Sequence, residues 1–208
     1  MQFIDFLART LQSSRIELVA VAAGLLCVWL LVKENIWNWP IGIANNILYI
    51  YIFLHAGLYA DMGLQFVYIT IAIYGWWNWL HGGQGHTELN TTHASGATLA
   101  AYSGMVAACT AVLYVILRRF TPSNVPFSDA LSTALFLTAQ YMMSRKLVEN
   151  WWFWIVGNVI AIGLYIYKDL KPTAILYSIF VVLCVMGLRE WRRAAQQEPQ
   201  AMPALGEA

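Results

Sequence analysis

Long apolar runs constrain what this chain can fold into more than any other feature of its sequence. A helix needs about 17–25 mostly apolar residues to cross a bilayer, and seven runs of about that length follow one another here. Backbone groups in lipid must be hydrogen-bonded internally, and the runs are too evenly apolar for barrel strands, so each is predicted to be a helix. The seven predicted spans are 16–34, 40–58, 62–80, 97–117, 127–144, 151–168 and 172–190.

Composition and motifs exclude several other classes of protein. Of the 208 residues, 60% are hydrophobic and only 11% are charged, whereas a soluble domain has about 25% charged residues. The net charge of +1 gives no basic surface for nucleic acid. Hydrolase, zinc-protease and nucleotide-loop motifs are absent, so neither an enzyme nor a cofactor is predicted. Cys27, Cys109 and Cys184 lie far apart in apolar runs, which indicates packing residues rather than a disulfide or a metal site.

The two ends of the chain differ from its apolar centre. Residues 1–15 alternate apolar and polar side chains, which fits either a short amphipathic helix on the membrane surface or a frayed terminus. No signal-peptide cleavage site follows the first apolar run. Residues 192–208 are polar and contain two prolines, so a flexible tail is expected. Lys and Arg divide six to six between the two sides, so the positive-inside rule does not select an orientation.

An internal repeat is visible around the second and sixth runs. At a spacing of 115 residues, Glu34–Gly42 and Glu149–Gly157 share Glu, Asn, two Trp and Gly. The match pairs the first three runs with the last three and leaves the run 97–117 as a linker, whose presence makes the two triplets parallel. Parallel repeats are a known transporter plan. We therefore predict an all-α membrane protein with a first repeat over 16–80, a linker helix over 97–117 and a second repeat over 127–191; a chance match of common residues is the alternative.

Polar side chains at membrane depth often mark a transport pathway. Trp151, Trp154 and Asn158 are spaced three and four apart and share one helix face. Flat rings beside an amide suit a planar heterocycle that carries hydrogen-bonding groups. For a single amide such as Gln140, interhelical hydrogen bonding is the alternative role. The candidate substrate-binding residues are Trp39, Asn46, Tyr49, Gln65, Tyr68, Gln140, Trp151, Trp154 and Asn158.

Acidic residues lie near the ends of the runs, and this placement favours a uniporter over an ion-coupled carrier. Asp61 and Asp129 each lie just before or within a predicted first turn and are expected to cap the N-termini of their helices, with a role in gating as the alternative. A membrane-embedded enzyme or assembly factor would show clustered His, Asp or Glu at one membrane face, and a channel would show a glycine-rich filter or an acidic ring. Neither pattern is present. The histidines of the loop 81–95 are expected to be solvated rather than to bind a metal.

The sequence Trp151-x-x-Trp154-x-x-x-Asn158 resembles the WxxWxxxN motif of the PnuC family of vitamin transporters. Glu149-Asn150 before it and the glycine–tryptophan segment 75–79 also match, and the resemblance extends over roughly residues 15–192. It implies a SWEET-like 3+1+3 fold, usually trimeric, in the bacterial inner membrane.

The same resemblance implies facilitated diffusion of nicotinamide riboside, a precursor of NAD. A cytoplasmic kinase would trap the product by phosphorylation. Trp151 and Trp154 would then hold the rings of the substrate, and Asn158 would bind its polar groups. Relatives in this family carry thiamine, riboflavin or deoxynucleosides, so these remain alternative substrates.

Overall fold

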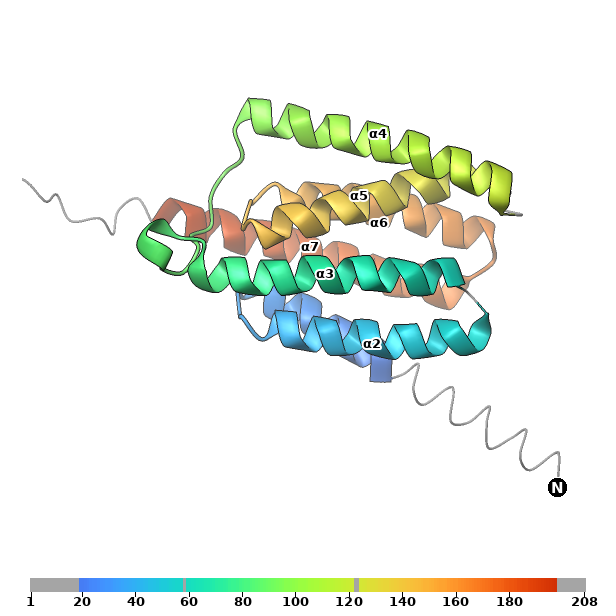
Figure 1. The fold of residues 1–208 in the computed structure, drawn as a ribbon, viewed down its shortest axis with the longest axis horizontal. Coiled ribbons are helices and arrows are strands. Elements are labelled where there is room, and N and C mark those ends of the chain that lie inside the picture. Colours follow the sequence, from blue (N-terminus) through green and yellow to red (C-terminus); the bar gives the residue numbers. More distant parts are fainter. Residues whose placement is uncertain (1–18, 58, 122–123, 198–208) are drawn as a thin grey trace, which may run out of the picture. The chain divides into compact units, whose positions relative to one another are not determined.

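The computed structural model describes residues 19–57, 59–121 and 124–197. The regular secondary structure in this part of the chain is helical (Figure 1). One isolated parallel bridge joins Thr92 and Leu147 among the described residues. A first helix covers Val19–Val32. The elements that follow are α2 (Asn38–Ala56), α3 (Tyr59–His81), the 3-10 turn η1 (Gln84–His86), α4 (Gly96–Phe120), α5 (Pro126–Ser144), α6 (Asn150–Tyr167) and α7 (Lys171–Gln197).

These helices lie on the seven predicted spans, and most of their ends agree within a few residues. By length and composition, the helices Gly96–Phe120, Asn150–Tyr167 and Thr173–Gln197 are long and apolar enough to cross a membrane. Large apolar side chains also point outward, for example Val112 at 60%, Ile166 at 62% and Ile175 at 63% exposure. A soluble protein rarely leaves so much apolar surface uncovered, which fits helices that face lipid.

The C-terminal boundary differs from the sequence prediction. A tail was expected from residue 192, but α7 continues to Gln197. The added turn contains arginine, alanine and glutamine, which are strong helix formers, so polarity does not end the helix there. The predicted amphipathic segment 1–15 and residues 198–208 lie outside the described residues. Asp61 and Asp129 lie in the first turns of α3 and α5, but the predicted capping role is wrong for Asp129, because Val125 is the N-cap of α5 and no side chain caps that helix.

The turns before α2 and α6 have the same backbone conformation. Glu34 and Lys146 both adopt the left-handed conformation, with φ of 52° and 50°. Four residues later, Asn38 and Asn150 begin α2 and α6, and each side chain donates from Nδ2 to the carbonyl oxygen three residues earlier, at 2.8 and 2.6 Å. Both asparagines are buried. The two turns are therefore built in the same way, at a spacing of 112 residues (146 − 34 and 150 − 38).

The ends of α2 and α6 repeat at the same spacing. Gly57 and Asp169, again 112 residues apart, both have positive φ, at 73° and 57°. The next helices, α3 and α7, begin two residues later, at Tyr59 and Lys171.

The predicted spacing of 115 is therefore wrong by three residues, close to one helical turn. Both segments contain several Trp, Asn and Gly residues only a few positions apart, so a short sequence match can be found at either spacing. The correct spacing still pairs α2 with α6. It aligns Trp39 with Trp151, Asn46 with Asn158, Gln65 with Tyr177, Gly75 with Gly187 and Trp79 with Trp191.

The chain divides into two compact units within α3, between Trp76 and Trp77. In the second unit, α5 packs against α4 and α6, and α6 packs against α7. A small core of Val106, Ala134 and Leu135 lies between α4 and α5. The last turn of α3 belongs to this unit, because Asn78 Nδ2 donates to the Ser144 carbonyl at 2.9 Å and Trp79 Nε1 donates to the Met143 carbonyl at 3.1 Å.

Candidate functional site

Trp151 is a packing residue between α6 and α7. Its side chain is 0% exposed, and its ring meets Trp191 edge-on at 5.5 Å and 88°. A Cβ atom added at Gly187 would overlap the Trp151 ring, so the glycine allows α7 to approach. In the first unit, Trp39 is 1% exposed and lies over Gly75 in the same way. The close approach of ring and glycine is thus present once in each compact unit.

Trp154 lies one turn further along α6 and is partly exposed. Its ring stacks on Phe136 of α5 at 5.3 Å and 27°. Phe136 also contacts Tyr177 of α7, and Tyr177 contacts Tyr165 of α6, with ring centroids 6.3 and 4.9 Å apart. These four rings, here called the aromatic cluster, bring three helices together. The Trp154 Nε1 atom is buried and has no hydrogen-bond acceptor among the described residues.

Asn158 lies one turn beyond Trp154 and is 3% exposed. Its Nδ2 atom donates to the Trp154 carbonyl at 2.8 Å and contacts Cys184 Sγ of α7 at 3.8 Å. The preceding residue, Gly157, lets Phe136 approach, since a Cβ there would lie 2.6 Å from Phe136 Cε1. The predicted stripe on α6 therefore faces two helices: Trp151 and Asn158 contact α7, and Trp154 contacts α5.

The other predicted residues lie on α5 and in the first unit. Gln140 of α5 is half-buried, as are Asn46, Tyr49 and Tyr68. Tyr49 stacks on Phe53 at 5.6 Å. Gln65 is 9% exposed, and its Nε2 donates to the Asp61 carbonyl on its own helix at 3.4 Å.

Sequence reasoning missed Phe136, Tyr165 and Tyr177 as members of the cluster. Two signals were available for them. Phe136 precedes Gln140 by four residues and so shares its helix face. Tyr177 is the counterpart of Gln65 at the spacing of 112 residues. Among the residues that the structure describes, no group of three His, Cys, Asp or Glu is placed to hold a metal ion.

Long apolar helices that carry buried aromatic and amide side chains are typical of a multi-pass membrane transport protein. The family model described as nicotinamide mononucleotide transporter matches residues 14–193, and the chain belongs to this family. Members of the family are transporters, and the chain is accordingly a multi-pass protein of the bacterial inner membrane. The family resemblance drawn from the motif is confirmed.

Individual relatives agree with this assignment. The chain is 29% identical to the nicotinamide riboside transporter PnuC of Escherichia coli (strain K12), over 88% of this chain and 87% of that protein. It is 26% identical to the riboflavin/roseoflavin transporter RibM of Streptomyces davaonensis, over 90% and 91%. A crystal structure of the vitamin B3 transporter PnuC has the same fold, with a TM-score of 0.72 and 24% identity over 88% of this chain and 83% of that one.

Proposed function

We propose that this protein carries nicotinamide riboside across the inner membrane by facilitated diffusion. The observation that carries the proposal is the arrangement on α6: Trp154, stacked on Phe136 and with an Nε1 atom that has no acceptor among the described residues, lies one turn from the buried amide of Asn158. The relatives named as nicotinamide riboside transporters support the same substrate. RibM supports riboflavin as the second candidate, and thiamine and deoxynucleosides are further alternatives within the family.

The chemistry of the substrate fits these side chains. The pyridinium ring of nicotinamide riboside carries a fixed positive charge, and a tryptophan face attracts a cation by about 0.5–2 kcal/mol. The Asn158 amide donates and accepts hydrogen bonds, as the carboxamide and ribose hydroxyls of the substrate require. Riboflavin is neutral and larger, so it gains no cation–π energy. In this proposal Trp154 and Asn158 contact the substrate, while Trp151 holds α7 against α6.

We propose a 3+1+3 arrangement in which α4 joins two parallel repeats, supported by the turns and glycine contacts that recur at 112 residues. Asn46 is the counterpart of Asn158 at that spacing. We propose that it contacts the substrate, as do Trp39, Tyr49, Gln65, Tyr68 and Gln140. Transporters built from repeats bind their substrates near the midplane of the membrane and work by rocking motions.

Transport needs no coupling ion in this scheme. A cytoplasmic kinase would phosphorylate the vitamin and prevent its return, and the protein would assemble as a homotrimer in the bilayer. These statements about partners follow from the family resemblance.

A titration of tryptophan fluorescence tests the substrate. The detergent-purified protein is titrated with nicotinamide riboside, thiamine and riboflavin in parallel. Calorimetry serves as a second readout, because light absorbed by riboflavin does not affect it. Saturable quenching by nicotinamide riboside alone supports the proposal. Saturation by riboflavin or thiamine alone keeps the transport class and replaces the substrate.

A further inference from the structure

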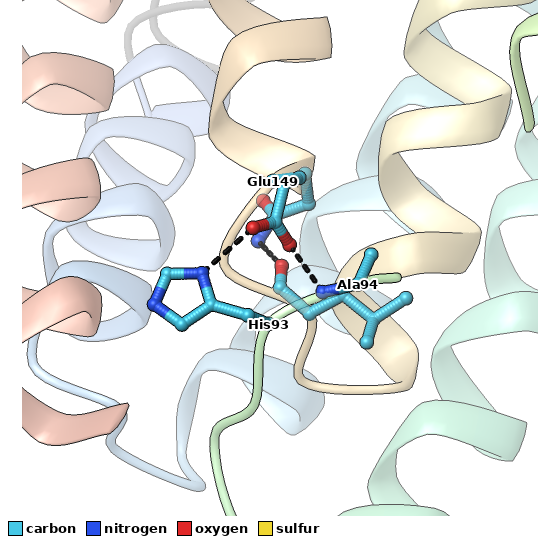
Figure 2. A network of polar contacts seen from close by, with 5 residues as sticks. His93, Ala94 and Glu149 are labelled. Carbon is cyan, nitrogen blue, oxygen red and sulfur yellow. Dashed lines mark hydrogen bonds and ion pairs between the residues drawn. The ribbon is translucent and has the colours of Figure 1, made fainter. Parts of the chain in front are cut away.

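Glu149, the last residue before α6, joins two parts of the chain that are more than fifty residues apart (Figure 2). Its Oε2 accepts the backbone N–H of Ala94 at 2.8 Å, and its Oε1 lies 2.7 Å from His93 Nδ1. A carboxylate only accepts hydrogen bonds, so Nδ1 carries the proton in this contact. The Glu149 side chain is 17% exposed. One carboxylate therefore binds both a side chain and a backbone group of the loop between α3 and α4.

The backbone of the same loop segment is bound as well. The N–H of Thr92 donates to the Lys146 carbonyl at 3.1 Å, and the N–H of Val148 donates to the Thr92 carbonyl at 3.0 Å. We call residues 92–94 the strap. The strap lies along the turn 146–149, and the next residue, Ser95, caps α4 by accepting the Thr98 N–H at 3.2 Å. The strap thus connects the start of α4 to the start of α6.

The first repeat provides an internal comparison for Glu149. The residue 112 positions earlier is Trp37, whose side chain is 63% exposed. Both residues have nearly the same backbone angles, φ −65° and ψ −13° for Trp37 and φ −69° and ψ −11° for Glu149. The turn therefore forms with no carboxylate at this position. What distinguishes Glu149 is its contact with the strap.

We infer that Glu149 is a positioning residue, which fixes the first turn of α6 to the strap and so holds Trp154 and Asn158 in place. A competing explanation is that a negative charge at a helix N-terminus is favourable by itself. Glu149→Gln separates the two explanations. Its amide has no charge, but its oxygen still accepts from Ala94, and its nitrogen donates to His93 Nδ1 once the imidazole proton has moved to Nε2.

Hydrogen–deuterium exchange of the full-length protein without substrate tests the inference. In Glu149→Ala, we expect peptides covering the strap and the first turn of α6 to exchange about tenfold faster, because the two hydrogen bonds that the Glu149 side chain makes are together worth about that factor. Glu149→Gln should stay close to the wild type. Glu88→Ala, on an exposed part of the same loop, is the matched control and should not change these peptides.

His93→Ala removes one of the two bonds and gives a milder test if Glu149→Ala does not fold. We expect faster exchange of the same peptides, by a smaller factor than in Glu149→Ala. Wild-type exchange in both alanine variants would overturn the inference. Equal acceleration in Glu149→Gln and Glu149→Ala would also overturn it, in favour of the charge alone.

The consequence for binding rests on the proposed function. We expect the Kd for nicotinamide riboside to rise about threefold to tenfold in Glu149→Ala and to be kept in Glu149→Gln, as loss of positioning costs part of the binding energy. Faster exchange of the strap in Glu149→Ala with an unchanged Kd would show that Glu149 does not position the binding residues. If the wild type fails to bind nicotinamide riboside, the proposed function fails, whereas the exchange result still decides the role of Glu149.

Discussion

At the scale of single residues, the two tryptophans of the α6 motif have different surroundings. Trp151 is fully buried on Gly187, whereas Trp154 is partly exposed and stacks on Phe136. The spacing in the sequence places both rings on one helix face, but it does not reveal which of them the neighbouring helices cover. Whether Trp151 is covered depends on how closely α7 approaches its ring. Gly187, 36 residues later in the sequence, allows this close approach.

Replacing Trp154 tests the substrate contact. We expect Trp154→Ala to weaken binding of nicotinamide riboside by about 1–3 kcal/mol, by analogy with bases stacked on aromatic side chains. Calorimetric Kd values measure the effect. Trp152→Ala is the control, because Trp152 is 47% exposed on the same helix and contacts Arg192 rather than the aromatic cluster. An unchanged Kd in Trp154→Ala would move the site elsewhere.

Replacing Gly187 tests the packing role of Trp151. A methyl group at this position overlaps a rigid, fully buried ring, so Gly187→Ala should destabilise the protein by about 1–3 kcal/mol. Thermal unfolding in detergent should show a lower apparent Tm. Gly163→Ala is the control: nothing lies within 4 Å of a Cβ there, and alanine is the better helix former. An apparent Tm of Gly187→Ala equal to that of the wild type would exclude the close packing of Gly187 against Trp151.

At the scale of elements, the length of the apolar runs predicted the helices well, because a membrane span is defined by its own residues. The register of the repeat was not predictable in this way. It is carried by backbone angles at Glu34 and Lys146, whose side chains have opposite charges and give no sequence match. The strap was also missed, because its contacts join Thr92 and Ala94 to a turn far away in sequence. Glu149 was noticed in the motif, but its partners were not.

The matching turns make a prediction for two distant asparagines. Asn38 and Asn150 are both buried, at 2% and 0% exposure, and make the same side-chain hydrogen bond. We expect Asn38→Ala and Asn150→Ala each to lower stability by about 0.5–1.5 kcal/mol, since each removes a hydrogen bond made by a buried amide. Thermal unfolding compares them with Asn90→Ala, on an exposed loop. A loss in one variant and none in the other would contradict the equivalence of the two turns.

At the scale of the whole molecule, the proposed substrate carries a positive charge, and no described helix places a carboxylate at its centre. Asp61 and Asp129 lie in the first turns of α3 and α5, and Glu190 lies about two turns before the end of α7. In the proposed uniport, transport of the bound cation would therefore move net charge across the bilayer. A uniporter of this kind is driven by the membrane potential as well as by the concentration gradient.

This coupling gives a prediction for the protein reconstituted in liposomes. An inside-negative potential of 100 mV is worth about 2.3 kcal/mol for one elementary charge, which corresponds to an accumulation ratio of about fifty. We therefore expect nicotinamide riboside to accumulate in liposomes clamped at that potential with potassium and valinomycin, and only to equilibrate at zero potential. Liposomes without protein are the control and measure the passive leak of nicotinamide riboside. If the ratio is the same at both potentials, the positive charge is compensated during transport, by an ion that moves with or against the substrate, and the uniport mechanism has to be abandoned even if nicotinamide riboside remains the substrate.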